Sequence, residues 1–175
     1  MNPLWKGLLL LAIASAPVQA AGPQLFKPDS LAAIQQKYAG RPFILSMWSA
    51  DGCSHCITEL TMLGKVAAEL NAHGKAAQGA ANPPEKLPLV LVATDTPGFS
   101  GPIRQTLKRL GLARMDSWVF DDGIPERLRH VIDPSWYGEL PRTYLYDAQH
   151  QRITVVGVMS EHKLKAWLKQ QAIAF

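Results

Sequence analysis

Apolar residues along the chain follow two spacings, and these divide it into alternating strands and helices. A near-continuous apolar run over 87–94 is typical of a strand buried on both faces, and the run over 42–48 predicts another strand. From Cys56 onward the apolar positions recur every three or four residues, which predicts a helix that fades near Asn71. The same spacings predict further helices over 30–40, 100–111, 125–132 and from Ser160 onward, and further strands over 118–120, 143–146 and 152–158.

Turn residues between these segments indicate how they connect. Asp147-Ala-Gln-His150, between the last two strands, predicts a hairpin, whereas helices separate the earlier strands. Residues 22–29 contain two prolines and are expected to be an extended lead-in, and 75–86, rich in Ala, Gly and Pro, predict a loop. Strands alternating with helices, then a hairpin and a helix, predict an α/β sandwich with a mixed β-sheet. Three serines are predicted to cap helices: Ser30, Ser100 and Ser160.

Residues 1–21 have the pattern of a secretory signal peptide. Lys6 gives a basic start, 7–14 are apolar, and 16–20 end in the small residues that a signal peptidase reads. The apolar run is shorter than the roughly 20 residues that span a bilayer, and an uncleaved anchor is the alternative. We therefore expect residues 22–175 to form the mature domain, exported to the periplasm, where disulfides persist.

Composition and charge narrow the class of protein. With 47% hydrophobic and 18% charged residues, the chain has the make-up of one ordinary globular domain. The formal net charge of +4 is modest and its basic residues are scattered over predicted helices, so nucleic-acid binding is not expected. The sequence indicates no particular oligomeric state. Four histidines lie in polar or loop surroundings and are expected at the surface: His73, His130, His150 and His162.

The only two cysteines, Cys53 and Cys56, lie where the strand over 42–48 gives way to the following helix. Cysteines three apart in a first helical turn share one face and can close a small disulfide ring. Unpaired N–H groups and the positive helix end favour a thiolate, which lowers the pKa of Cys53, and a protonated His55 would favour it further. Because the thiolate is the attacking species in thiol–disulfide exchange, this stretch is predicted to be a redox site.

Three other interpretations of the cysteine pair compete with redox exchange. A structural zinc site needs about four ligands, and no second cysteine pair exists. A purely structural disulfide usually joins distant segments, whereas this small ring constrains little of the unfolded chain. Two inert buried thiols would suit a cytosolic protein, which the signal-like start argues against. Redox exchange is therefore the favoured interpretation.

Three separated segments carry a family resemblance. The first is the strand–CxxC–helix unit with Trp48 and Glu59, the second is 89–95 with its terminal Asp95, and the third is the Gly-x-x-Pro stretch of 138–147. Together they resemble the thioredoxin-fold proteins of the exported TlpA/ResA/DsbE branch, over roughly residues 30–172. The resemblance implies a thioredoxin-like three-layer sandwich, its central mixed sheet flanked by helices, with a helix–strand insertion at 102–132 before a cis-proline motif.

The resemblance also implies roles for site residues. Cys53 would be the exposed nucleophile and Cys56 the buried resolving thiol, with Glu59 as a nearby proton donor or acceptor. Pro141 would be a cis-proline beside the cysteines, leaving the preceding backbone free to pair with an extended substrate. Three aromatics could form an apolar rim for that peptide, although single aromatics are more often core: Trp48, Trp136 and Tyr137.

The chain departs from the branch at four points. Gly52 replaces a tryptophan that often precedes the first cysteine, Met47 stands where thioredoxin carries a buried acid, and Thr61 replaces a helix-kinking proline. The dipeptide Ser54-His55 is closer to the Pro-His of the oxidant DsbA than to the Gly-Pro of thioredoxin. His55 favours an oxidising site and Glu59 a reducing one, so the direction of electron flow stays open.

The expected function is an exported protein thiol–disulfide oxidoreductase that acts through mixed disulfides with substrate cysteines. We expect a reductase of apocytochrome or metal-site cysteines that draws electrons from a membrane donor protein, and no cofactor or resident metal. The alternative enzyme is a DsbA-like oxidase or isomerase. An alternative of another class is a Cu(I) chaperone using Cys53 and Cys56, although the chain lacks a Met/His-rich tract.

Overall fold

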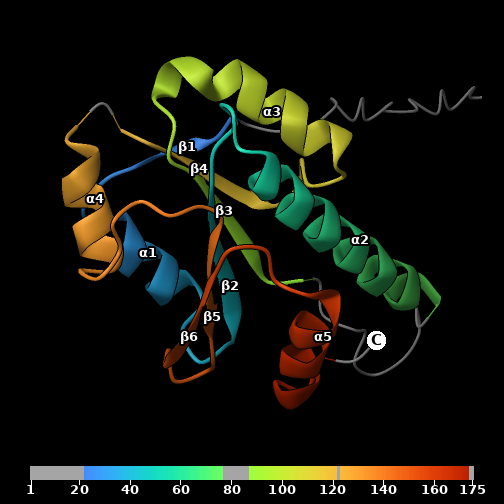
Figure 1. Cartoon of the computed structure of the whole chain (residues 1–175). Helices are drawn as coiled ribbons and strands as arrows, with labels where there is room; N and C mark the ends of the chain where they lie inside the picture. The colour runs from blue at the N-terminus through green and yellow to red at the C-terminus, as the bar shows by residue number, and fades with distance from the viewer. Residues whose placement is uncertain (1–21, 77–86, 122, 174–175) are drawn as a thin grey trace, which may run out of the picture.

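Six strands form one mixed sheet in the computed structural model, which describes residues 22–76, 87–121 and 123–173 (Figure 1). The predicted signal segment and most of the predicted loop at 75–86 lie outside the described residues. The strands stand in the order β1-β4-β3-β2-β5-β6. Their bounds are β1 (Gln24–Phe26), β2 (Phe43–Trp48), β3 (Leu89–Ala93), β4 (Asp116–Phe120), β5 (Arg142–Tyr146) and β6 (Arg152–Val156).

The pairing directions confirm the mixed sheet. β1, β4, β3 and β2 are parallel neighbours, whereas β5 pairs antiparallel with β2 and with β6, as the predicted hairpin requires. The lead-in prediction was incomplete, because Gln24–Phe26 pairs with β4 as an edge strand. Three residues between two prolines are too short for a periodic signal, so this strand depends on its tertiary partner.

Helices cover both faces of the sheet, and the predicted three-layer sandwich is confirmed. In Figure 1, α1 and α4 lie on one side of the sheet and α2, α3 and α5 on the other. The central insertion is present as α3 and β4, which separate β3 from α4, and β4 takes its place between β1 and β3. The bounds are α1 (Ser30–Lys37), α2 (Ser54–Ala76), the 3₁₀ turn η1 (Pro97–Phe99), α3 (Ser100–Arg109), α4 (Pro125–Ile132) and α5 (Glu161–Gln170).

Three helix predictions need correction. α2 runs to Ala76, past the predicted fading near Asn71, because exposed residues such as those at 71–73 can continue a helix without adding to its apolar pattern. Ser30 is the first residue of α1 rather than its cap, and its hydroxyl accepts a hydrogen bond from the Lys27 N–H. Ser100 likewise is the first residue of α3 rather than its cap, because η1 leads directly into that helix. Ser160 does cap α5, accepting from the Lys163 N–H at 3.2 Å.

Two apolar clusters fill the space between the layers. One lies between the sheet and α2, α3 and α5 and includes Cys56, Leu60 and Leu63, and the other lies under α1 and α4. Gly64 lets α2 pack closely against the end of α3, since a Cβ there would overlap the Leu110 carbonyl. Among the described residues, no helix has the length and apolar character that a membrane span needs.

The alternation of side chains along β2 decides what lies beneath the cysteine helix. Ile44 and Trp48 belong to the cluster on the α2 face, whereas Phe43 and Met47 belong to the opposite cluster. The position of β2 that lies between Ile44 and Trp48 on the α2 face is therefore Ser46. Met47, which the resemblance had placed at the position of a buried acid, belongs to the cluster on the face away from the cysteine helix.

Candidate active site

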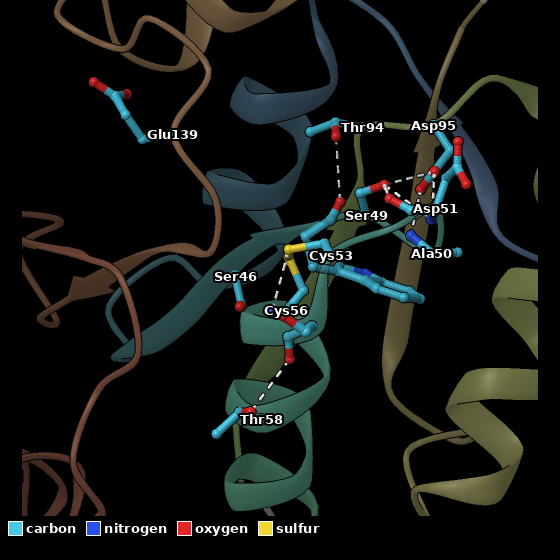
Figure 2. Close-up of a disulfide and its surroundings, with 12 residues drawn as sticks. Ser46, Ser49, Ala50, Asp51, Cys53, Cys56, Thr58, Thr94, Asp95 and Glu139 are labelled. Carbon is cyan, nitrogen blue, oxygen red and sulfur yellow. Dashed lines mark hydrogen bonds between the residues drawn. A yellow bond between two sulfur atoms is a disulfide. The ribbon is translucent and has the colours of Figure 1, made fainter.

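The two cysteines form a disulfide at the N-terminus of α2 (Figure 2). Cys53 directly precedes the helix, and its carbonyl accepts from the Ile57 N–H at 3.2 Å. Its sulfur accepts from the Cys56 N–H, also at 3.2 Å. The Cys53 sulfur therefore acts as the N-cap acceptor of α2, because it accepts from a backbone N–H that would otherwise have no partner in the helix.

The two sulfurs differ in access to solvent. Cys53 is half-buried, whereas Cys56 is 0% exposed and belongs to the cluster with Leu60 and Leu63. The intervening His55 is exposed. Only Cys53 is therefore placed to react with a large partner.

A carboxylate at the end of β3 fixes the turn that leads into the disulfide. Asp95 accepts from the Ser49 hydroxyl at 2.8 Å and from the Ala50 N–H at 2.9 Å, and the contacts are drawn in Figure 2. Its other contact is with the Asp51 N–H, at 3.3 Å. Gly52 then adopts φ +64°, a conformation that side chains disfavour. This left-handed turn accounts for the glycine directly before Cys53.

Glu59 lies one helical turn beyond Cys56 and is 0% exposed. One carboxylate oxygen accepts from the Met159 N–H at 2.7 Å and the other from the Thr143 hydroxyl at 3.2 Å. The Thr143 hydroxyl also lies 3.3 Å from the hydroxyl of Ser46 on β2. Burial raises the pKa of Glu59, and the hydrogen bonds from Met159 and Thr143 oppose that shift only in part.

The predicted proline motif lies at the same end of the sheet as the disulfide. The Leu140–Pro141 peptide bond is cis, as the resemblance implied. Arg142 pairs with Met47, so Pro141 lies beside the end of β2, shortly before the cysteines. The Pro141 carbonyl accepts from the Gly157 N–H at 2.9 Å. Within the described residues, no hydrogen bond engages the backbone N–H or carbonyl of Leu140.

The three aromatics proposed for a peptide rim separate into two kinds. Trp48 and Trp136 are buried, and the Trp136 indole N–H donates to the Glu139 carbonyl at 3.0 Å. Tyr137 is 86% exposed, so it alone is available as a rim residue. The buried Trp48 indole N–H has no hydrogen-bond partner among the described residues.

One of the four histidines expected at the surface is partly buried instead. His150 lies half-buried in the hairpin, 3.1 Å from the Tyr38 carbonyl, with its ring edge-to-face with Phe43. It therefore joins the hairpin to the end of α1. The other three are exposed as expected: His73, His130 and His162.

Sequence reasoning missed a buried charged network on the opposite face of the sheet. Asp133, which follows α4, is 4% exposed and lies within 3.2 Å of guanidinium nitrogens of Arg142 and Arg152. Its carboxylate also accepts from the Tyr144 hydroxyl and from Ser135. The available signal was an arginine at the start of the apolar strand Arg-Thr-Tyr-Leu-Tyr, because a buried arginine needs an acidic partner.

In the part of the chain that the structure describes, no group of three or more His, Cys, Asp or Glu residues is arranged to hold a metal ion. The site itself consists of one sulfur pair, with a buried carboxylate one turn away and, within the described residues, an unengaged peptide group at Leu140.

Comparison with known proteins relates this geometry to solved structures. No protein family and no curated protein matches the chain in sequence. A secreted Mycobacterium tuberculosis disulfide oxidoreductase homologous to E. coli DsbE matches in structure with a TM-score of 0.51 at 18% identity, over 77% of this chain and 85% of its own. The chain has a thioredoxin-like fold.

Two further structures carry the same fold. A DsbF homologue from Corynebacterium diphtheriae matches with a TM-score of 0.55 at 17% identity, over 78% of this chain and 75% of its own. A thioredoxin-family thiol:disulfide interchange protein from Chlorobium tepidum matches with 0.53 at 16% identity, over 78% and 83%. In this thioredoxin-like chain, as predicted, the cysteine pair lies at the start of the helix that follows β2, with Cys53 directly before α2 and Cys56 in its first turn.

Proposed function

We propose that this protein is an exported thiol–disulfide oxidoreductase that acts on cysteines of other proteins. The observation that carries the proposal is the asymmetric disulfide, in which a half-exposed Cys53 caps α2 and Cys56 is buried behind it. Structures with the same fold are described as disulfide oxidoreductases and thiol:disulfide interchange proteins, which supports it. The signal-like residues 1–21 and the description of one such structure as secreted support export.

In the reductive direction, the reaction begins with both cysteines as thiols. The Cys53 thiolate attacks a substrate disulfide, so a new S–S bond forms while the substrate bond breaks and one substrate sulfur leaves as a thiolate. The Cys56 thiol loses its proton and attacks the Cys53 sulfur, releasing the second substrate sulfur. Two electrons pass to the substrate, and the protein ends with the Cys53–Cys56 disulfide seen here.

Each step has a group suited to assist it. The N–H groups at the start of α2 stabilise the Cys53 thiolate, because one of them already donates to that sulfur. Glu59, one turn from Cys56 and with a raised pKa, can take the proton from the resolving thiol. The free peptide group of Leu140, before Pro141, can pair with the backbone of an extended substrate.

The reductase direction is supported by Glu59. A carboxylate buried next to a cysteine pair disfavours the thiolate, and a site that stabilises its thiolate poorly is a stronger reductant. Equilibration with glutathione buffers should give a reduction potential nearer to thioredoxin, at about −270 mV, than to DsbA, at about −120 mV. A value near that of DsbA would favour the alternative, a disulfide oxidase. Electrons for the reductase would come from a dithiol donor protein at the membrane, and apocytochrome or metal-site cysteines are the proposed acceptors.

Trapping tests the assigned roles. Cys56→Ser should leave the mixed disulfide on Cys53 unresolved, so substrates should accumulate as adducts on non-reducing gels, whereas Cys53→Ser should trap none. A limiting alkylating reagent should label Cys53 of the reduced wild-type protein well before Cys56. Adducts on the Cys53→Ser protein, or equal labelling of both thiols, would show that the roles are misassigned.

A further inference from the structure

Asp133 and Arg142 form a buried ion pair that closes the loop containing Pro141. The guanidinium Nη2 of Arg142 donates to Asp133 Oδ2 at 2.7 Å, and both side chains are less than a tenth exposed. Arg142 Nε donates to the Tyr144 hydroxyl at 2.8 Å, and that hydroxyl donates to the same Asp133 oxygen at 3.2 Å. The guanidinium is therefore held in orientation as well as in position.

The residues between the two charges are tied to the pair. Asp133 Oδ1 accepts from the Ser135 N–H at 3.0 Å and from its hydroxyl at 2.7 Å. The Glu139 carboxylate lies 3.7 Å from Arg142 Nη1 and accepts from the Tyr137 N–H at 3.3 Å. The loop is thus bound to itself through side chains, while the peptide group of Leu140 stays unengaged within the described residues.

The first residues of β5 are anchored on both faces of the sheet. Arg142 reaches the end of α4 on one face, and the next residue, Thr143, donates to Glu59 of the cysteine helix on the other. Pro141 directly precedes these two anchors. The path of the backbone beside the disulfide therefore depends on a carboxylate that lies across the sheet from the cysteines.

Stability alone does not require charges at this position. A buried ion pair is often replaceable by apolar residues without loss of stability, because desolvation offsets much of the attraction. The ion pair instead fixes orientation, because a planar guanidinium binds its partners only in a narrow range of geometries. Such a fixed orientation suits a loop that must present a peptide group to a substrate in one orientation.

We propose that Arg142 and Asp133 are positioning residues that hold the Leu140–Pro141 segment in register for an extended protein substrate. The inference rests on the proposed function. Neither residue touches the sulfurs, so attack on a small disulfide that has no peptide backbone should not depend on them.

The test gives two disulfide probes to the reduced wild-type protein and to its reduced variants, and compares the rates at which each probe is reduced. One probe is a synthetic decapeptide whose single cysteine is disulfide-linked to glutathione, and the other is bis(2-hydroxyethyl) disulfide. In single-turnover reactions, Arg142→Met should lower the second-order rate constant for the peptide about tenfold or more, mainly by raising the peptide concentration that gives half the maximal rate, because misplacement of a positioning group is costly. The rate with bis(2-hydroxyethyl) disulfide and the reduction potential should stay within about twofold and a few millivolts of wild type.

Two further variants make the comparison decisive. Arg142→Lys keeps the charge without the fork and should fall between Arg142→Met and wild type, and it serves as the test if Arg142→Met does not fold. Arg152→Met, which removes the other arginine on Asp133 but leaves the loop contacts, should keep the wild-type ratio of the two rates. A folded Arg142 variant with an unchanged ratio, or with equal losses on both probes, would overturn the inference. Wild-type protein that reduces neither probe would instead overturn the proposed function.

Discussion

Two carboxylates are buried on opposite faces of the same sheet, and their surroundings differ in kind. Glu59 receives two neutral donors, the Met159 N–H and the Thr143 hydroxyl, and no lysine or arginine in the described part of the chain forms an ion pair with it. Asp133 lies against two guanidinium groups. One carboxylate is thus buried without a counter-charge, and the other has two.

The pKa shifts follow from that difference. Burial raises the pKa of Glu59, and neutral hydrogen bonds do not cancel the effect. Burial alone would also raise the pKa of Asp133, but hydrogen bonds from Arg142 and Ser135 and the charge of Arg152 outweigh it, so that pKa lies well below its usual range. A carboxylate with a raised pKa can exchange protons in a reaction, whereas one held as an anion serves as a fixed anchor.

Removing the charge of Asp133 should have the largest effect of these changes, and the effect is on the free energy of unfolding. Asp133→Asn leaves Arg142 buried without its counter-charge, and breaking one partner of a buried ion pair costs about 3–5 kcal/mol. Urea denaturation of the oxidised protein at pH 7 should show this loss as a lower midpoint with a similar slope.

An exposed acid offers the matched control. Glu126 pairs with Arg129 at the start of α4 but is largely exposed, so Glu126→Gln should leave the urea midpoint close to that of wild type. Equal losses from the two substitutions would mean that burial does not set the strength of the Asp133 pair.

Removing the exchangeable carboxylate should slow one step of the reaction. Glu59→Gln keeps the shape of the side chain but cannot accept the Cys56 proton, so resolution of the mixed disulfide should slow by about 10²-fold near pH 7. The deficit should shrink as pH rises toward the pKa of the thiol itself, because the thiol then ionises without help. Single-turnover quenched-flow measurements over pH 6–9 would separate resolution from the initial attack.

The same helix supplies a control for the rate effect. Glu69 is partly exposed and pairs with Lys165, away from the cysteines, so Glu69→Gln should resolve its mixed disulfide at the wild-type rate. A Glu59→Gln protein with a wild-type pH profile would remove the proton-transfer role from Glu59.

Local patterns in the sequence were enough to predict the frame of the active site. The apolar runs that became β2 and β3, and the cysteine spacing at the start of α2, are read within a few residues of one another. The cis bond before Pro141 also agrees with the short motif that carried the family resemblance. Each of these features depends on neighbours in the chain.

Partners that lie far apart in the chain could not be read in this way. Glu59 is separated from Thr143 by 84 positions and from Met159 by 100, and no periodic pattern links them. Ser46 faces the cysteine helix and Met47 does not, because the strand register decides which side chain turns inward. The Asp133 network likewise needs α4, β5 and β6 to be assembled before its charges meet.

The smallest expected effect is on the pH dependence of the unfolding free energy, which compares the two buried carboxylates most directly. The folded-state pKa of Glu59 lies above its unfolded value of about 4.3, so its contribution is fully present below that pH and is lost as pH rises through the folded pKa. Glu59→Gln does not titrate at this position. The unfolding free energy of Glu59→Gln minus that of wild type should therefore rise with pH from about 4.3 and level off above the folded pKa. The rise should be about 1.4 kcal/mol for each pH unit that separates the folded and unfolded pKa values of Glu59.

Asp133 provides the opposite sign in the same experiment. Its pKa is lowered on folding, so its contribution is present above its unfolded value of about 3.9 and is lost only as pH falls below that range. The unfolding free energy of wild type minus that of Asp133→Asn should thus stay constant above about pH 5 and shrink at lower pH. The corresponding difference for Glu59→Gln should instead change as pH rises from about 4.3. Urea titrations of the oxidised proteins, in which the cysteines do not titrate, would measure both. A flat Glu59 difference from about pH 4.5 to 8 would mean that its two neutral hydrogen bonds offset burial completely, and that the two buried carboxylates differ less than their surroundings indicate.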